Sequence, residues 1–248
     1  MSAPAWLTAR PIAHRGLHDR ARGIIENTIS AADAAIAGSF PIECDVQDTA
    51  DGDAVIFHDH TLDRLTAARG PVRERRAQEL AGMLVGGTGD RIPSFAEFLQ
   101  HIAGRVGLIV EVKSRFAGAM ALTRRTCELA LAYTGPIAIK SFDPAVVAEV
   151  RRIAPSLPRG IIAQASYEHS DWAALTPEQK HALATLAHAD ESQPNFISWR
   201  VADLPCAVPR LCSGIGRLPI MAWTVRTTEE RRRAAQHADQ MVFEGFVP

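Results

Sequence analysis

Three acidic residues stand inside two otherwise apolar segments of this 248-residue sequence. Glu43 and Asp45 lie two residues apart in IECDVQ, and Glu111 lies in LIVEVKS with Lys113 two positions later. Residues two apart on a strand point to the same face, so each pair shares a face. Grouped carboxylates are costly to bury unless a cation neutralises them, and such oxygen ligands suit Mg²⁺ or Ca²⁺. Singly, each acid could cap a loop or pair with Lys113; jointly, they predict a metal site.

Two histidines end short apolar segments, His14 in IAHRG and His58 in VIFHD. Imidazole titrates near neutrality and can accept or donate a proton, so the pair predicts acid/base catalysis. The sequence leaves open which ring is the base, and we take His14 as the base and His58 as the acid for the hypothesis tested below. Arg15 reaches the same place only if the loop after its strand curls, and its guanidinium then suits two phosphate oxygens. Otherwise Arg15 is a surface or salt-bridging residue. Lys140 either contacts phosphate or extends to solvent.

The elements that must position these residues alternate along the chain. Short and mostly continuous apolar segments, typical of parallel strands covered on both faces, are expected at residues 12–16, 41–47, 108–114, 137–142, 159–164, 196–201, 219–225 and 240–246. Helical patterns are expected between them at residues 27–38, 116–133, 144–153, 176–188, 204–215 and 227–237.

Eight strands that alternate with helices in a chain of this length predict an α/β fold, the (β/α)8 TIM barrel. Active sites of such barrels gather where the C-terminal ends of the strands meet the following loops. The structural alternative is a doubly wound open sheet. No strand–GxGxxG–helix unit supports that alternative.

One region breaks the alternation. Residues 55–59 read as an extra short strand after the second strand of the barrel. Residues 60–92 are rich in arginine and glycine and weakly periodic, and a helical pattern resumes at residues 94–101. We therefore expect a single barrel domain over residues 1–248, with residues 60–92 as a small insertion that lies over one end of the barrel.

The composition excludes several classes of protein. Hydrophobic residues make up 47% of the chain and charged residues 22%, which is typical of a globular protein. A formal net charge of −1 provides no basic field for nucleic acid or an anionic membrane, and no apolar run has the length of a membrane span. The first residues lack the pattern of a signal peptide, and the cysteines form no CxxC pair. We expect a cytoplasmic protein that acts on a small molecule, with homo-oligomer formation left open.

A series of short motifs connects these residues to a known family. They occur in this order: His14-Arg15-Gly16, Glu26-Asn27-Thr28, Glu43-x-Asp45, His58-Asp59, Leu62-x-Arg64-Leu65-Thr66, Ile92-Pro93-Ser94, Glu111-x-Lys113, Ser141-Phe142 and Trp223-Thr224-Val225. In these motifs the chain resembles the glycerophosphodiester phosphodiesterases. The resemblance extends from residue 12 to about residue 247 and is strongest in the N-terminal half.

The resemblance implies a metal-dependent barrel enzyme that hydrolyses glycerophosphodiesters to sn-glycerol 3-phosphate and an alcohol. It also implies one divalent ion, Mg²⁺ or Ca²⁺. By this resemblance the site residues have the following roles: Glu43, Asp45 and Glu111 bind the metal, His14 and His58 are the acid/base residues, Arg15 and Lys113 bind the phosphate, and Trp223 lies near the glycerol. The sequence departs from the family pattern in two places. Ile25 stands where the family usually has proline, and Phe243-Glu244 stands where it usually has Thr-Asp.

Two other functions fit parts of the same pattern. A phospholipase that acts on a related lipid phosphodiester would share the histidines and basic groups. It would also need a means of docking on lipid, and the sequence shows neither an amphipathic basic helix nor an exposed apolar loop. A non-catalytic phosphodiester-binding barrel would be marked by the loss of a histidine or an acid, and here all of them are present.

Overall fold

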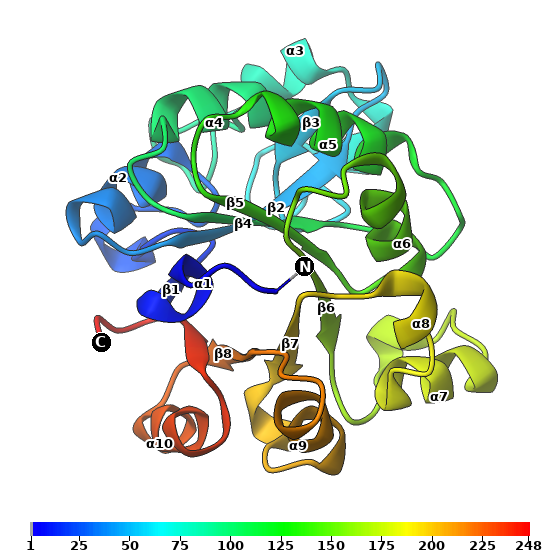
Figure 1. The fold of residues 1–248 in the computed structure, drawn as a ribbon. Coiled ribbons are helices and arrows are strands. Elements are labelled where there is room, and N and C mark those ends of the chain that lie inside the picture. Colours follow the sequence, from blue (N-terminus) through cyan, green and yellow to red (C-terminus); the bar gives the residue numbers. More distant parts are fainter. Residues whose placement is uncertain (1) are drawn as a thin grey trace.

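Eight parallel strands close into a barrel in the computed structural model, which describes residues 2–248 (Figure 1). Neighbouring strands follow the order β1-β9-β8-β7-β6-β5-β4-β2, and pairing of β1 with β2 closes the ring. A ninth strand, β3, pairs antiparallel with the C-terminal half of β2. The strands are β1 Ile12–His14, β2 Ile42–Asp48, β3 Ala54–Ile56, β4 Leu108–Val112, β5 Ile137–Ser141, β6 Arg159–Ala163, β7 Phe196–Arg200, β8 Ile220–Val225 and β9 Gln240–Phe243. This arrangement confirms the predicted TIM barrel.

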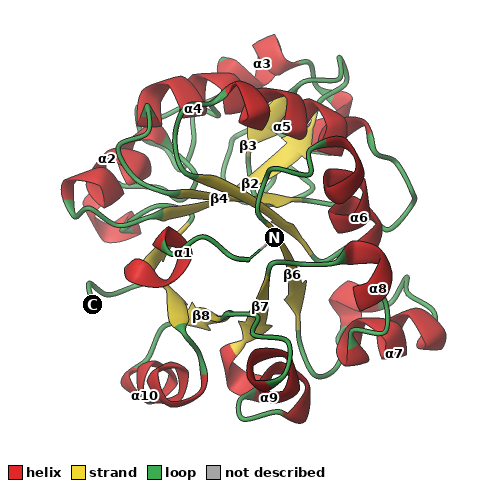
Figure 2. Cartoon of the chain, in the orientation of Figure 1, coloured by secondary structure: helices red, strands yellow, loops and turns green. Residues whose placement is uncertain are grey.

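Helices surround the barrel on its outer face (Figure 2). They are α1 Trp6–Ala9, α2 Ile29–Ala37, α3 Ala77–Ala81, α4 Phe95–Ile102, α5 Ala121–Ala132, α6 Pro144–Ile153, α7 Pro177–Thr185, α8 Ala189–Ser192, α9 Ala207–Gly214 and α10 Thr228–His237. Helix α6 begins as predicted, because Asp143 accepts a hydrogen bond from the backbone N–H of Ala145 and Pro144 follows it. The helix predicted from residue 116 was wrong at its start: it begins at Ala121, because Phe116 has a φ of 56°, outside the helical region.

The register of the parallel strands aligns the polar residues that the sequence singled out. His14 pairs with Glu43, and Glu111 pairs with Asp45 on one side and with Lys140 on the other. Side chains of residues paired across neighbouring strands stand on the same face of a sheet. The four strands β1, β2, β4 and β5 therefore present these groups together.

The residues that alternate with Glu43 and Asp45 on β2 face the helices. Ile42, Cys44 and Val46 are fully buried in a hydrophobic cluster that also contains Phe95 and Phe98 of α4. A slip of one residue in this strand would turn the apolar side chains into the barrel and the acids against α4. Burial of apolar surface, at roughly 25 cal/mol per Å², thus fixes which face of β2 carries the acids.

The N-terminal end of the barrel is filled by apolar side chains. Ile12, Ile109 and Phe196 pack there with Leu7 of α1, and all four are essentially inaccessible to solvent. Helix α1 and the N-terminal segment lie across this end of the barrel in Figure 1. The polar groups inside the barrel lie nearer to the other end, where the predicted site residues also are.

The segment between β3 and α4 has a small hydrophobic core of its own. Leu62, Leu65 and Leu80 are buried there, and Ile25, from the loop after β1, belongs to the same cluster. Gly86 approaches Ile25 so closely that an added Cβ would lie 2.6 Å from the Ile25 Cγ1 atom. Ile25 therefore joins the insertion to the loop after β1. This packing favours one domain that includes the insertion, which stays a prediction.

Among residues 2–248, no helix combines the length and the apolar character that crossing a bilayer requires. The four cysteines are Cys44, Cys127, Cys206 and Cys212, and all four are free thiols.

Candidate active site

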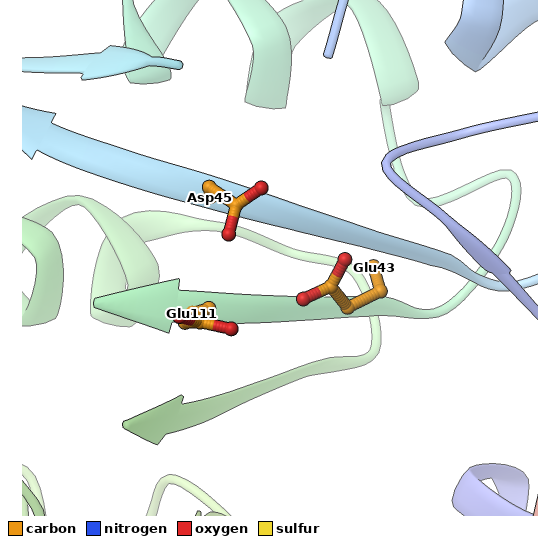
Figure 3. A group of neighbouring side chains, drawn as sticks. All are labelled: Glu43, Asp45 and Glu111. Carbon is orange, nitrogen blue, oxygen red and sulfur yellow. The ribbon is translucent and has the colours of Figure 1, made fainter. Parts of the chain in front are cut away.

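The three acids predicted to bind a metal lie together inside the barrel (Figure 3). Glu43 and Asp45 project from β2 and Glu111 projects from β4. One carboxylate oxygen of each lies within 4.8 Å of the others. Their exposed fractions are only 0%, 1% and 7%, respectively. The sequence pattern thus located a buried trio of carboxylates correctly.

Two lysines compensate this buried negative charge. The Lys113 Nζ atom lies 2.7 Å from Asp45 Oδ1 and 2.5 Å from Glu111 Oε1. The Lys140 Nζ atom lies 3.0 Å from Glu43 Oε1. Lys140 is only 4% exposed, so the expectation that it might extend to solvent was wrong. Its place opposite Glu111 in the register of β5 turns it into the barrel.

These contacts keep the acids ionised. Burial by itself raises the pKa of Asp45, but the nearby positive groups, with Lys113 the strongest, together outweigh burial and hold that pKa well below its usual value. Burial also raises the pKa of Glu43, but the charge and hydrogen bond of Lys140, together with smaller contributions, lower it overall. Burial lowers the pKa of Lys113, but the charges of Asp45 and Glu111 raise it by more, so the pKa is raised overall. Glu43, Asp45 and Lys113 are therefore charged at neutral pH.

The trio fits a divalent cation by the chemistry of its donors. Three carboxylates with neighbouring oxygens form a hard donor set of the kind that binds Mg²⁺ or Ca²⁺. Among residues 2–248, Lys113 and Lys140 bring two ammonium groups to the three acids, and the Arg15 guanidinium near Asp45 is shared with Glu26. The residues Glu43, Asp45 and Glu111 are therefore suited to hold such an ion.

His14 is held from behind by a carboxylate that follows β9. Its Nδ1 atom lies 2.5 Å from Glu244 Oε2, and Arg226 donates to both oxygens of Glu244 at 3.0 and 3.3 Å. The His14 Nε2 atom lies 3.9 Å from Glu43 Oε2. Burial lowers the pKa of His14, and the hydrogen bond to Glu244 only partly offsets this. A neutral imidazole with its Nδ1–H directed at Glu244 leaves Nε2 as a free base.

His58 has a similar partner but a more open position. Its Nδ1 atom lies 2.7 Å from Asp59 Oδ1, and its side chain is 31% exposed. The Gln47 side-chain amide donates to the backbone carbonyls of His58 and Asp59 at 2.8 and 2.9 Å. The ring is therefore fixed through both its backbone and its Nδ1 atom, while its Nε2 atom remains available.

Arg15 turns toward the acids because its backbone φ is 56°, in the left-handed region. The strand therefore ends at His14, earlier than predicted. Arg15 Nη1 lies 2.6 Å from Glu26 Oε1, and its Nε atom lies 3.4 Å from Asp45 Oδ2. Of the alternatives for Arg15, the structure shows a salt-bridging residue beside the acids, and contact with phosphate stays a prediction.

Sequence reasoning missed several supporting residues. Asn27 is 3% exposed and donates from its side chain to Asp45 Oδ2 at 2.8 Å, and its Oδ1 atom accepts from the Asp45 backbone N–H at 3.3 Å. Its φ of 57° is a conformation that asparagine tolerates better than most residues. An asparagine between Glu26 and the helix cap Thr28 was the available signal for this role.

A large open cavity adjoins the buried acids. It has a volume of about 1050 Å³, and Glu111, Lys113, His58 and Trp223 are among the residues that line it. Within the described residues, its lining does not include Glu43 or Asp45, or the predicted site residues His14 and Arg15. The predicted site is therefore divided into a buried part and a part that faces the cavity.

Four partly exposed aromatic residues form one side of this cavity: Phe116, Phe142, Trp172 and Trp223, here called the aromatic wall. Phe142 contacts Trp223 with ring centroids 5.4 Å apart and Trp172 with centroids 4.9 Å apart. Phe116 continues the wall at 6.1 Å from Trp172. Trp223 is fixed by donating from Nε1 to the Ser198 carbonyl at 2.8 Å. The wall offers a ligand apolar faces beside a charged site.

Comparisons with known proteins agree with this geometry. The model of the glycerophosphoryl diester phosphodiesterase family matches residues 14–243. A glycerophosphodiester phosphodiesterase of Caldanaerobacter subterraneus subsp. tengcongensis is 32% identical over 163 residues, which cover 62% of this chain and 66%, slightly under two thirds, of that protein. A Bacillus subtilis protein named for the same activity, YhdW, is 30% identical over 245 residues, which cover 95% of this chain and 92% of YhdW.

Solved structures share the fold. A protein of Silicibacter pomeroyi is similar with a TM-score of 0.73 and 25% identity, covering 98% of this chain and 91% of that chain. A phosphodiesterase of Oleispira antarctica is similar with a TM-score of 0.74 and 22% identity, covering 95% and 92%. Fold and site together define a phosphodiesterase built on a TIM barrel. The chain belongs to the glycerophosphoryl diester phosphodiesterase family, as the sequence motifs predicted.

The pH dependence of unfolding should show that Glu26 is ionised in the folded protein. Burial raises the pKa of Glu26, but hydrogen bonds from Arg64 and the charge of Arg15 lower it from 4.5 to about 2. Because the pKa is lower in the folded state, the carboxylate stabilises the fold above pH 4.5, and this stabilisation is lost as the pH falls towards 2. It amounts to about 3 kcal/mol at most. Urea unfolding of Glu26→Gln should show this deficit at pH 7 and a shrinking deficit at lower pH.

A matched control is Glu74→Gln, which removes an exposed carboxylate from the insertion. This variant should unfold like the wild-type protein at every pH. A deficit for Glu26→Gln that stays constant from pH 7 to pH 3 would contradict the assignment.

Proposed function

We propose that this chain hydrolyses glycerophosphodiesters to sn-glycerol 3-phosphate and an alcohol. The observation that carries the proposal is the buried trio Glu43, Asp45 and Glu111 beside two histidines that are each hydrogen-bonded to a carboxylate. Membership of the phosphodiesterase family supports it. The Oleispira antarctica phosphodiesterase, which has the same fold, was solved in complex with the product sn-glycerol-3-phosphate, and this supports the choice of product.

The buried acids and their lysines would bind the charged part of the substrate. A divalent cation held by Glu43, Asp45 and Glu111 would stabilise negative charge on the phosphoryl group and lower the pKa of the attacking hydroxyl. Lys113 already faces the cavity and would contact a phosphate oxygen, and Arg15 would contact a second one. Preorganised positive charge of this kind acts strongly in a site shielded from water.

The two histidines would move the protons. His14 is buried and its pKa is lowered, so its Nε2 atom would accept the proton of the nucleophile, which is either water or the glycerol 2-hydroxyl. His58 faces the cavity, and its Nε2 atom would donate a proton to the departing alkoxide. Glu244 and Asp59 fix the two rings through their Nδ1 atoms. A cytoplasmic location stays a prediction, and homo-oligomer formation stays open.

A coupled assay for sn-glycerol 3-phosphate tests the reaction and its cation together. We expect the protein to release this product from glycerophosphocholine, to lose most of the activity after treatment with EDTA, and to regain it with Mg²⁺ or Ca²⁺. The coupling enzyme is checked in parallel with added sn-glycerol 3-phosphate. If none of several glycerophosphodiesters yields the product, the proposal is contradicted. Full activity of the metal-free protein would contradict the role of the three acids.

Substitution tests the assigned proton transfers. His14→Ala and His58→Ala should each lower kcat by about 10²- to 10⁴-fold, the usual contribution of a general acid or base. The control is His181→Ala, because His181 is exposed on α7, away from the cavity lining. Either active-site variant with near wild-type kcat would remove that histidine from the mechanism.

The aromatic wall favours a second candidate, the cleavage of a lipid phosphodiester. A cavity of about 1050 Å³ is at the upper end of the range for small-molecule sites, whereas sn-glycerol 3-phosphate is a small ligand. Trp172 and Phe116 extend the wall beyond Trp223 and Phe142. Tyr167 is buried against Trp172, and Leu175 adds a further apolar side chain to the cavity lining. A substrate that retains one acyl chain would cover these rings.

Trp172→Ala separates the two candidates. If a lysophospholipid is the substrate, the variant should lose roughly tenfold or more in kcat/KM for it, because about 1.5–3 kcal/mol of apolar contact is removed. Turnover of glycerophosphocholine should change much less, and Trp172→Phe should retain most activity on both substrates. A wild-type protein that cleaves glycerophosphocholine but leaves lysophosphatidylcholine intact would exclude the lipid candidate.

A further inference from the structure

Arg64, in the insertion, joins two carboxylates from different loops. Its Nε and Nη2 atoms lie 2.6 and 2.9 Å from the two oxygens of Asp59. Its Nη1 and Nη2 atoms lie 2.8 Å from the two oxygens of Glu26. One guanidinium therefore makes four hydrogen bonds in two forked pairs. In the described part of the chain, no other side chain bonds to both of these acids.

Each carboxylate continues to a residue of the proposed mechanism. Asp59 holds the Nδ1 atom of His58 at 2.7 Å, and Glu26 holds Arg15 at 2.6 Å. A chain of alternating charges thus runs from a buried acid to the histidine that faces the cavity: Asp45, Arg15, Glu26, Arg64, Asp59 and His58. Arg64 is the link between its buried half and its exposed half.

The backbone around Arg64 is anchored although its side chain is exposed. The side chain of Arg64 is 44% exposed, whereas Leu62 and Leu65 beside it are 0% and 6% exposed in the core of the insertion. Ile25 of the same core precedes Glu26. Apolar packing therefore fixes the backbone next to Arg64 and next to Glu26, and the ion pairs set the directions of the side chains.

The exposure of Arg64 also indicates what the bridge is for. The ion pair between Arg64 and Asp59 is the more exposed of the two, so water and salt reduce its contribution to the stability of the fold. Its geometry can still restrict a neighbouring ring, and a displacement of about 1 Å at a reacting group can cost about 100-fold in rate. Hydrogen bonds from Arg64 and His58, together with their charges, lower the pKa of Asp59 despite its partial burial, so this acid remains ionised.

We propose that Arg64 is a positioning residue for the reaction, one that holds His58 in place through Asp59, with Glu26 and Arg15 as the fixed anchor. The inference rests on the proposed function, because that function makes His58 the acid. The bridge requires arginine, since the planar fork can bind two carboxylates in pairs and the single ammonium of lysine cannot.

Two substrates with different leaving groups provide the test. Glycerophosphocholine releases an alkoxide that must be protonated, whereas the p-nitrophenyl diester of glycerol 3-phosphate releases a phenolate that needs no proton. Arg64→Ala and Arg64→Lys should both lower kcat about 100-fold on glycerophosphocholine and less than about tenfold on the p-nitrophenyl diester. KM should change less than kcat, and adding Asp59→Asn to Arg64→Ala should cost little more than the larger single effect.

The matched control is Arg69→Ala, since Arg69 lies in the same insertion and is 83% exposed. It should retain wild-type kcat on both substrates, and thermal melts should show all variants folded. Equal losses on the two substrates, or an Arg64→Lys variant within about twofold of wild-type kcat, would overturn the inference alone. A wild-type protein that cleaves neither diester would refute the proposed function, and the inference with it.

Discussion

The repulsion among three buried carboxylates is the constraint on which the rest of the structure depends. Glu43, Asp45 and Glu111 are nearly inaccessible to water, and burial of such groups is tolerated only when positive charge lies beside them. Lys113, directly after β4, and Lys140, on β5, supply that charge. Because the strands are held in register by apolar residues on their outer faces, the packing of the barrel against its helices determines the electrostatics inside it.

The two histidines have the same hydrogen-bonding arrangement in different surroundings. Each imidazole has a carboxylate at Nδ1, and each carboxylate is held by an arginine, Arg226 for His14 and Arg64 for His58. The difference lies in burial: His14 is 8% exposed and its pKa is lowered, while His58 faces the cavity. This difference in burial supports the proposed roles of His14 as the proton acceptor and His58 as the proton donor.

Much of the fold and of the site was predictable because the signals are local. Continuous apolar segments mark the strands, and Glu43, Asp45 and Glu111 are conspicuous because they interrupt such segments. What was missed depends on distant parts of the chain. The partner of Lys140 is decided by the register of β5 on β4, and Glu244 meets His14 only because β9 closes the barrel 230 residues later. Backbone angles at Phe116 and Arg15 left no clear sequence signal.

The small core shared by Ile25 and the insertion has a consequence for how this barrel could be altered. In the sequence, residues 60–92 resemble an insertion that the barrel does not need. In the structure, however, Leu62 and Leu65 share a hydrophobic cluster with Ile25, which precedes Glu26, the partner of Arg15. Deletion of this segment would expose the apolar side chain of Ile25 and remove the packing that fixes the loop after β1. The insertion therefore supports the loop that carries Arg15 and Glu26, and it adds His60 to the lining of the cavity.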